Sequence, residues 1–187
     1  MADNNNVELE AKSQGPHANL YLSSQIILRA LVISSTLAAT WTLTTAKQSV
    51  VIFGFTLDAR YSYSSAFKFF ALANAIACGF CLLSLCFVFI SSRQLALGNR
   101  QRNFSFFFFF FVHDLLMMGL VVSGCAAATA IGFVGRYGNT HTGWSPICDQ
   151  FAKFCNRITI SIAISYFAVL CLLILTIISA YPTKLHR

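Results

Sequence analysis

Two ionisable side chains of opposite charge, Arg29 and Asp114, each lie in a stretch that is otherwise apolar enough to cross a lipid bilayer. An unpaired charge at the bilayer centre costs roughly 2.5–3.5 kcal/mol on insertion scales, so such residues are rare and usually have partners. A bidentate guanidinium–carboxylate pair would satisfy the hydrogen-bonding groups of both residues. The alternative is that Arg29 extends to the headgroups while Asp114 is protonated or meets water.

Redox chemistry is suggested by Cys78 and Cys81, which form a CxxC motif. Four-span, quinone-linked enzymes that form disulfides combine such a motif with a second cysteine pair, so a thiol–disulfide oxidoreductase is the alternative function from another class. However, Cys78 lies about eleven residues into its apolar stretch, and thiol exchange needs access to a protein partner. We therefore interpret the intramembrane cysteines as small buried apolar residues.

Other chemistry finds little support in the residue pattern. The four histidines are scattered, no metal-ligand spacing or nucleophile–base constellation is present, and we predict no catalytic residue, cofactor or metal. His113 is adjacent to Asp114 and is expected to point to a different helix face. A small pore is a third hypothesis, but Asn74 is the remaining strongly polar residue deep in a span, and a buried hydrogen bond explains it.

The elements that position these residues follow from composition. The chain is 57% hydrophobic and 10% charged, whereas soluble domains have about 25% charged residues. Helices are predicted at about 21–46, 67–90, 106–134 and 158–180, because about 20 apolar residues span the hydrocarbon core. We expect one all-α, four-helix membrane domain over about 21–181, a disordered cytosolic tail over 1–20 and a short cytosolic tail over 182–187.

Depth within these helices favours the charge pair. Arg29 lies about nine residues into the first helix, roughly 13 Å along its axis. Asp114 lies about eight residues past Phe106 on a helix that runs in the same direction, roughly 12 Å along. The matching depths predict that the two side chains meet.

Lysine and arginine are almost evenly divided between the two sides, so they do not set the topology. Cys148 and Cys155 are the cysteines outside the spans, and a disulfide there would suit an oxidising exterior. We therefore predict both termini in the cytosol. The net charge of +7 is spread around the membrane edges and is not a nucleic-acid signature. We interpret it as ordinary topology-setting charge, with attraction of anionic membrane lipids by Arg93, Arg100 and Arg102 as the alternative.

Small residues at four-residue spacing predict where helices pack closely in lipid. One such row is in the second helix and two are in the third: Ala71, Ala75 and Gly79; Gly119, Ser123 and Ala127; Gly124, Ala128 and Gly132. Two rows on the third helix suggest neighbours on two of its sides. The run of phenylalanines over 106–111 predicts a bulky apolar belt, with an oligomer contact as the alternative.

The loop before the fourth helix contains two conflicting signals. Ser145 and Pro146 are typical of a helix N-cap and first helical position. In a helix, Cys148 and Cys155 would be about 10.5 Å apart along the axis, which exceeds the Cα separation of about 4.4–6.8 Å in a disulfide. A bridge therefore requires a broken helix, and both possibilities stay open. Trp144 is expected to anchor at the membrane interface.

A family resemblance becomes visible at these residues. The intramembrane arginine and aspartate are accompanied by AFKFFALANAI at 66–76, GNTHTGW at 138–144, ICDQF at 147–151 and FC at 154–155. The chain resembles the plant Casparian strip membrane domain protein-like (CASP-like) family, relatives of the tetraspan MARVEL proteins, over about residues 21–180. Its loop motif is expected at Trp144, Cys148, Asp149, Phe151 and Cys155.

The resemblance implies a multi-pass plasma-membrane protein that is not an enzyme. Such proteins form homodimers, heterodimers and higher oligomers with related members, and act as scaffolds that organise membrane domains and recruit cell-wall-modifying enzymes. The distinctive first-loop stretch of the Casparian strip proteins is absent from residues 48–55. Casparian strip assembly is therefore not implied for this chain.

Overall fold

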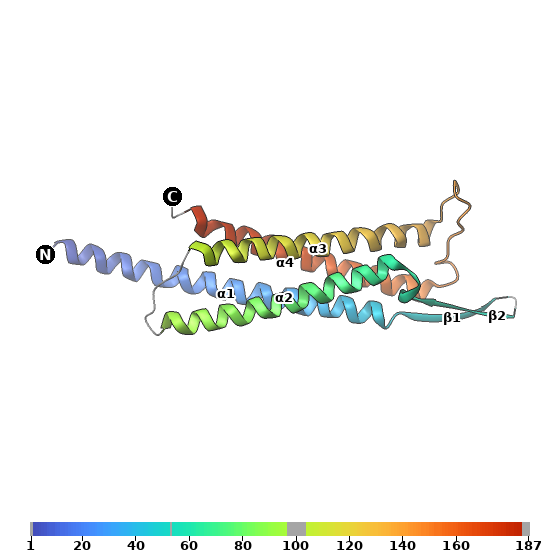
Figure 1. Ribbon diagram of the computed structural model, residues 1–187, viewed down its shortest axis with the longest axis horizontal. Helices are drawn as coiled ribbons and strands as arrows, with labels where there is room; N and C mark the ends of the chain where they lie inside the picture. The colour runs from blue at the N-terminus through green and yellow to red at the C-terminus, as the bar shows by residue number, and fades with distance from the viewer. Residues whose placement is uncertain (1, 53, 97–103, 185–187) are drawn as a thin grey trace.

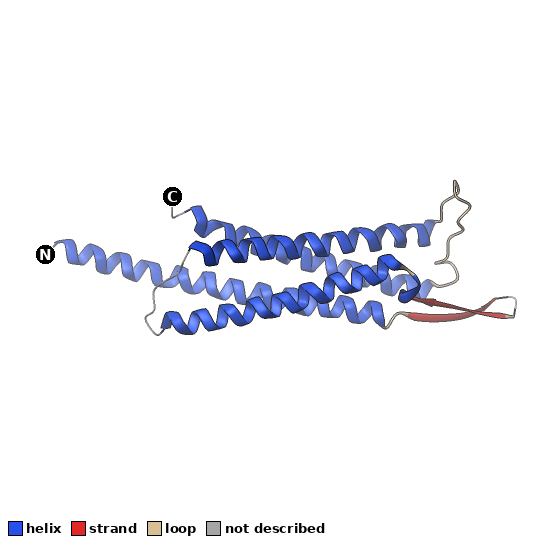
Figure 2. Ribbon diagram, viewed as in Figure 1, coloured by secondary structure: helices blue, strands red, loops and turns tan. Residues whose placement is uncertain are grey.

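The computed structural model describes residues 2–52, 54–96 and 104–184, with side chains for 23–51, 54–90 and 108–180. It consists of four long helices and one β-hairpin (Figures 1 and 2). The elements in chain order are α1 (Ala2–Thr44), β1 (Lys47–Ile52), β2 (Phe55–Arg60), the 3₁₀ turn η1 (Tyr61–Tyr63), α2 (Ser65–Ala96), α3 (Phe104–Tyr137) and α4 (Ala152–Lys184).

The helices form an up-and-down bundle. Each packs against two others, so that α1–α2–α3–α4 close into a ring in which α1 lies diagonally across from α3 and α2 lies across from α4. Both termini are at one end, and the hairpin and the α3–α4 loop are at the other (Figure 1). We call these the terminal side and the hairpin side.

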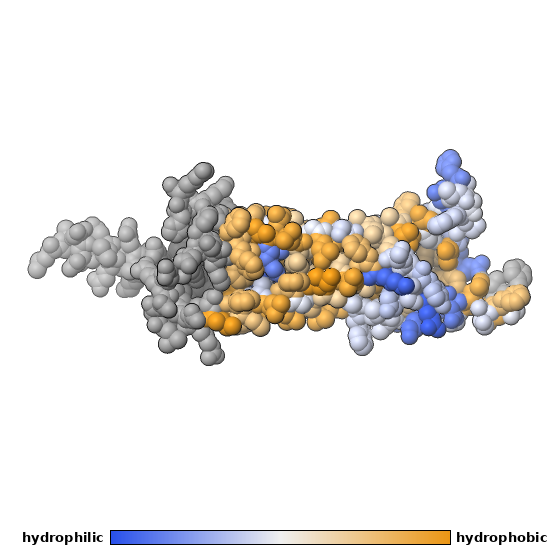
Figure 3. Space-filling model, viewed as in Figure 1, coloured by the Kyte–Doolittle hydropathy of each residue, from blue (hydrophilic) through white to orange (hydrophobic). Residues whose placement is uncertain are grey.

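All four helices are long and apolar enough to cross a membrane, which confirms the predicted four-span domain. The spanning stretches are Ser23–Thr44, Ser65–Ile90, Phe108–Tyr137 and Ala152–Ala180. Figure 3 shows an apolar band over the middle of the bundle and hydrophilic residues gathered toward the hairpin side. Large apolar side chains such as Leu72, Leu116 and Leu170 are exposed on the outside of the bundle, as expected for helices that face lipid.

Close packing between α2 and α3 depends on Gly124. A Cβ atom at this position would lie 3.1 Å from the Cβ of Ala73 and 3.4 Å from the Cα of Phe70. Neighbouring core positions are filled by Phe70, Val121 and Leu172, each fully buried. The absence of a side chain at Gly124 therefore lets the two backbones approach, as small residues do in membrane bundles.

The hairpin was not predicted. Its strands pair antiparallel from Lys47 opposite Arg60 to Ile52 opposite Phe55, and Gly54 adopts a positive φ of 83° in the turn. Gln48 attaches the hairpin to the bundle, because its Oε1 accepts a hydrogen bond of 2.9 Å from the backbone N–H of Phe154. The spanning domain is helical as predicted, with a small sheet projecting beyond it (Figure 2).

The N-terminal segment also differs from the predicted disordered tail. Helix α1 begins at Ala2 and projects past the other helices on the terminal side (Figure 1). Extending an existing helix adds one hydrogen bond per residue fixed and avoids the unfavourable nucleation step. Continuity with the first span is the physical reason we assign to this helix. Of the predicted C-terminal tail, residues 182–184 are within α4, and residues 185–187 lie outside the described part.

Candidate functional site

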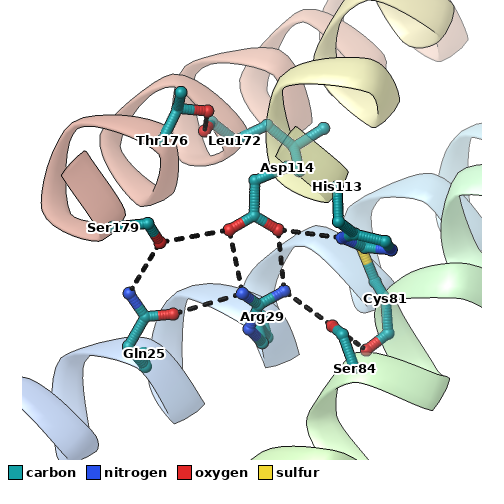
Figure 4. A network of polar contacts seen from close by, with 9 residues as sticks. All are labelled: Gln25, Arg29, Cys81, Ser84, His113, Asp114, Leu172, Thr176 and Ser179. Atoms are coloured by element: carbon teal, nitrogen blue, oxygen red, sulfur yellow. Dashed lines mark hydrogen bonds and ion pairs between the residues drawn. The ribbon is translucent and has the colours of Figure 1, made fainter. Parts of the chain in front are cut away.

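Arg29 and Asp114 form a bidentate ion pair at the core of the bundle. Nη1 of Arg29 donates to Oδ1 of Asp114 at 2.9 Å, and Nη2 donates to Oδ2 at 2.8 Å. Both side chains are 0% exposed. The pair joins α1 to α3, the helices that lie diagonally across the ring (Figure 4). The structure thus brings together the two charges whose matching depths predicted a contact.

Side chains from the other two helices complete the site. Nη1 of Arg29 also donates to Ser84 of α2 at 2.6 Å, and Nη2 donates to Oε1 of Gln25 at 3.3 Å. Ser179 of α4 donates to Asp114 at 3.3 Å and accepts from Nε2 of Gln25 at 3.3 Å. All four helices therefore contribute to one polar network, in which the guanidinium and the carboxylate are each shared with neutral groups (Figure 4).

His113 belongs to this network, contrary to the prediction. Its Nδ1 lies 3.1 Å from Oδ1 of Asp114, and its side chain is only 10% exposed. The ring stacks on Phe109 and packs against Phe80, with centroid distances of 6.4 Å and 6.0 Å. The rule that adjacent helical residues face apart fixes the direction of each Cα–Cβ bond, but it does not fix where the end of a long side chain lies. The aromatic contacts hold the imidazole beside its neighbour's carboxylate.

The phenylalanine run is divided between two environments. Phe108 and Phe109 are exposed on the outside of the bundle, whereas Phe110 is 6% exposed. The guanidinium carbon of Arg29 lies 5.0 Å from the centroid of the Phe110 ring. One member of the predicted apolar belt thus makes a cation–π contact with the buried charge, an interaction that is strengthened by desolvation.

A second polar cluster joins the other diagonal. Oδ1 of Asn74 on α2 accepts a 2.8 Å hydrogen bond from Ser165 on α4, and Nδ2 donates to the carbonyl of Phe70 at 2.9 Å. The thiol of Cys125 on α3 lies 3.2 Å from the Ser165 hydroxyl. Asn74 therefore has partners for both its carbonyl and its amino group inside the bundle, as expected for a buried hydrogen bond.

The CxxC cysteines are poorly placed for exchange with another protein. Cys78 is 5% exposed and Cys81 is 0% exposed, and both are free thiols on the apolar part of α2. Cys125 and Cys171 are likewise buried, whereas Cys86 is exposed. Within the residues that the structure describes, no three histidine, cysteine or acidic side chains gather as a metal site.

Cys148 and Cys155 form a disulfide with a Cα separation of 5.7 Å. The backbone N–H groups of Ile147 and Cys148 both donate to the carbonyl of Gly135, at 2.8 Å and 3.1 Å. These bonds hold the chain in a turn, and α4 begins only at Ala152. Of the two possibilities left open by the sequence, the broken helix is the one present, and it allows the bridge.

The rest of the loop motif has a mainly structural arrangement. Gly138 has a φ of 71°, and a Cβ there would lie 2.6 Å from the carbonyl oxygen of Trp144, so the tight turn requires glycine. Phe151 is buried, with 7% exposure, whereas Trp144 is 61% exposed. Asp149 is exposed as well. Trp144 and Asp149 are therefore the members of the motif that a partner could reach.

The small-residue rows separate into inner and outer ones. Gly124 and Ala128 are buried, and Gly132 lies close to Ile162. In contrast, Ala75, Gly79, Gly119 and Ser123 are exposed, while Ala71 and Ala127 are half-buried. One row of α3 therefore packs inside the bundle, and the rows through Gly79 and Gly119 turn toward its outside.

Comparisons with known proteins agree with the fold. The profile of the Casparian strip membrane protein domain matches residues 20–171. CASP-like protein 1F1 from Ricinus communis is 53% identical over 96% of this chain and 97% of its own length. CASP-like protein 1F1 from Vitis vinifera is 52% identical over 94% and 84%, and CASP-like protein 1F2 from Populus trichocarpa is 51% identical over 89% and 88%. No solved structure matches the chain. Together, the four apolar helices and these relatives show that the chain is a multi-pass membrane protein belonging to the CASP-like family.

Proposed function

We propose that the protein is a non-enzymatic scaffold of the plasma membrane. It associates laterally with copies of itself and with related chains, and it organises a membrane domain in this way. The internal pairing of Arg29 with Asp114 supports this role, because the charges are satisfied by the chain's own residues instead of facing a transported ion or substrate. The names of its relatives as CASP-like proteins are consistent with a scaffold.

The observation that carries the proposal is the outward row of small residues on α3. Gly119, Ser123, Ala126 and Ala130 are all exposed, and a Cβ at Gly119 would meet nothing within 4 Å. Helices associate in lipid by close backbone approach, because lipid tails are as apolar as the side chains they would replace. A row of small residues with no partner in its own bundle is therefore suited to a second bundle.

Replacing glycine with leucine on this row tests the proposal. Donor- and acceptor-tagged copies are reconstituted in lipid vesicles, and energy transfer is measured as the protein is diluted with lipid. Gly119→Leu is expected to reduce the associated fraction several-fold, because a bulky side chain separates the two backbones. Ile131→Leu is the matched control, since Ile131 is also exposed on α3 but lies on a different helix face from Gly119.

Unchanged energy transfer in Gly119→Leu would exclude the α3 row as the contact. The same measurement on Gly79→Leu then tests the equivalent outward row on α2, where a Cβ would also meet nothing within 4 Å. If both leucine variants associate as the parent chain does, lateral association through these surfaces is refuted.

We infer further that the termini are cytosolic and that the hairpin side faces the cell wall, where it recruits cell-wall-related enzymes. The Cys148–Cys155 disulfide on the hairpin side supports this orientation, since structural disulfides persist in oxidising compartments. An epitope inserted at Gly54 should be reached by antibody on intact protoplasts, whereas a C-terminal epitope should require permeabilisation. Proximity labelling from each side would then identify the neighbours, and labelling of cell-wall enzymes from the terminal side alone would contradict the assignment.

A further inference from the structure

A large cavity on the hairpin side is left open by the side chains that surround it. It measures about 700 Å³ and lies where the ends of α3 and α4 meet the α3–α4 loop and the base of the hairpin. This volume is in the range of about 300–1,000 Å³ that is typical of small-ligand pockets. Its walls are mostly apolar and include Phe133, Phe154, Ile158 and Ile162.

The cavity enters the part of the bundle that lies in the membrane. Its lining on α3 runs from Thr129 to Tyr137, which corresponds to about 12 Å of helix axis. Both residues belong to the spanning stretch that ends at Tyr137. With Arg136 and Tyr137 at the level of the headgroups, the lining from Thr129 to Gly135 reaches about 9 Å into the roughly 15 Å of hydrocarbon that one leaflet contributes.

Charged side chains line the same cavity and give it a positive excess. Arg60, Arg136 and Asp58 all contribute to the lining. Arg60 is paired with Asp58 at 3.4 Å, and both are partly exposed. Arg136 is exposed and forms no ion pair with any side chain in the described part of the chain. One guanidinium is therefore left without a carboxylate.

We propose that this cavity binds an anionic phospholipid from the leaflet on the hairpin side. One acyl chain lies against the apolar walls, and the phosphate and its anionic headgroup lie near Arg136. The pairing of an apolar cleft at leaflet depth with an unneutralised arginine favours this occupant over a wholly apolar one. The aromatic Tyr137 and Trp144, which also line the cavity, are the residue types found at the level of the headgroups.

Quenching of tryptophan fluorescence measures occupancy of the cavity, because Trp144 lines it. The chain has only one other tryptophan, Trp41. The full-length W41F variant, which leaves Trp144 alone, is placed in phosphatidylcholine bilayers. These contain equal mole fractions of either brominated phosphatidylglycerol or brominated phosphatidylcholine with the same acyl chains. The anionic lipid is expected to be enriched about fivefold beside Trp144, as one basic residue near a bilayer surface attracts anionic lipid.

Two arginine variants distinguish a built site from general surface charge. Arg136→Gln should abolish the preference for the anionic lipid. Arg157→Gln removes the same charge on the hairpin side, but Arg157 donates to the carbonyl of Thr45 and does not line the cavity, so the preference should be retained. Asp58→Asn should strengthen the preference, because Asp58 is the only carboxylate among the described residues that line the cavity.

A third variant tests whether an acyl chain occupies the cleft. Thr159 is exposed and lines the cavity, so Thr159→Phe fills space without disturbing a buried position and should reduce quenching by both lipids. The proposal is overturned if the two lipids quench equally in the parent chain, or if Arg157→Gln loses the preference as fully as Arg136→Gln. Undiminished quenching in Thr159→Phe would overturn it as well, and would indicate that the lipid lies outside the cleft.

Discussion

Removing only one partner of the buried ion pair should destabilise the bundle far more than removing both. Arg29→Met leaves the Asp114 carboxylate with two longer contacts, from Ser179 at 3.3 Å and His113 at 3.1 Å. Breaking a buried pair in this way typically costs about 3–5 kcal/mol. Because both side chains are 0% exposed and water cannot replace the lost donor, we expect about 4 kcal/mol.

The double variant Arg29→Met/Asp114→Leu removes both charges, and Ser84 and Gln25 keep partners, whereas the largely buried His113 loses its contact with Asp114. Ser84 still donates to the carbonyl of Cys81 at 3.0 Å, and Gln25 still donates to Ser179 at 3.3 Å. The residual cost is then about 2 kcal/mol, within the range of about 1–3 kcal/mol for a buried polar group that loses its partner. The double variant should therefore be more stable than Arg29→Met by about 2 kcal/mol.

Unfolding in mixed micelles of increasing dodecyl sulfate fraction, followed by circular dichroism, gives these differences. Thr176→Val is a suitable control, because the Thr176 hydroxyl is buried but is bonded to the carbonyl of Leu172 in its own helix. It should change the unfolding free energy by no more than about 1 kcal/mol. A double variant no more stable than either single variant would refute the reasoning, since the cost would then come from lost packing and not from an unpaired charge.

Three further perturbations follow from contacts elsewhere in the chain. Gly124→Leu should destabilise the bundle by about 1–3 kcal/mol or more in the same unfolding assay, because a Cβ at this position would lie only 3.1 Å from the Cβ of Ala73 on α2. A variant as stable as the parent chain would contradict the close approach of the two helices. Replacing Cys148 and Cys155 with serine should lower the unfolding free energy by about 2.5 kcal/mol, because the unfolded chain is no longer constrained by the short loop. Peptide mapping of the parent chain without reductant should find Cys148 linked to Cys155 and to no other cysteine. Gln48→Ala removes the acceptor for the N–H of Phe154, so amide exchange over residues 47–60 should accelerate several-fold while exchange in α2 is unchanged; equal protection in both proteins would show that the hairpin is held by other contacts.

Much of the membrane domain could be predicted from the sequence. A spanning helix needs about 20 apolar residues, which makes it easy to recognise in a sequence, and the structure has the four spanning helices that were predicted. The contact between Arg29 and Asp114 followed from depth alone, because two helices that run in the same direction place residues of similar offset at the same level. Depth could not show that α1 and α3 lie diagonally across the ring from one another. The ion pair therefore crosses the centre of the ring.

The missed features are those in which local rules compete. The hairpin had a usable signal in the β-branched and aromatic residues on both sides of Gly54, a pattern typical of strands joined by a short turn. The Ser145–Pro146 pair had a valid capping signal, but the N–H groups of Ile147 and Cys148 donate to the carbonyl of Gly135, 12 and 13 positions earlier, and hold the segment in a turn. The contact of His113 with Phe109 has the four-residue spacing of neighbours on one helix, but its contact with Phe80 of α2 could not be predicted from spacing within α3.

The diagonal pairing also has a consequence for the order of events during synthesis. Arg29 precedes Asp114 by 85 positions in the chain, and ribosomes add about 5–20 residues per second. The arginine is therefore made about 4–17 s before its carboxylate, and Ser179 is made later still. Until α3 arrives, α1 carries an unneutralised guanidinium that the translocon or lipid headgroups must accommodate. Insertion of the third helix is thus the step after which the nascent chain can leave the insertion machinery with its charge neutralised, and a chain that stops before it keeps an unpaired charge at the level of the membrane.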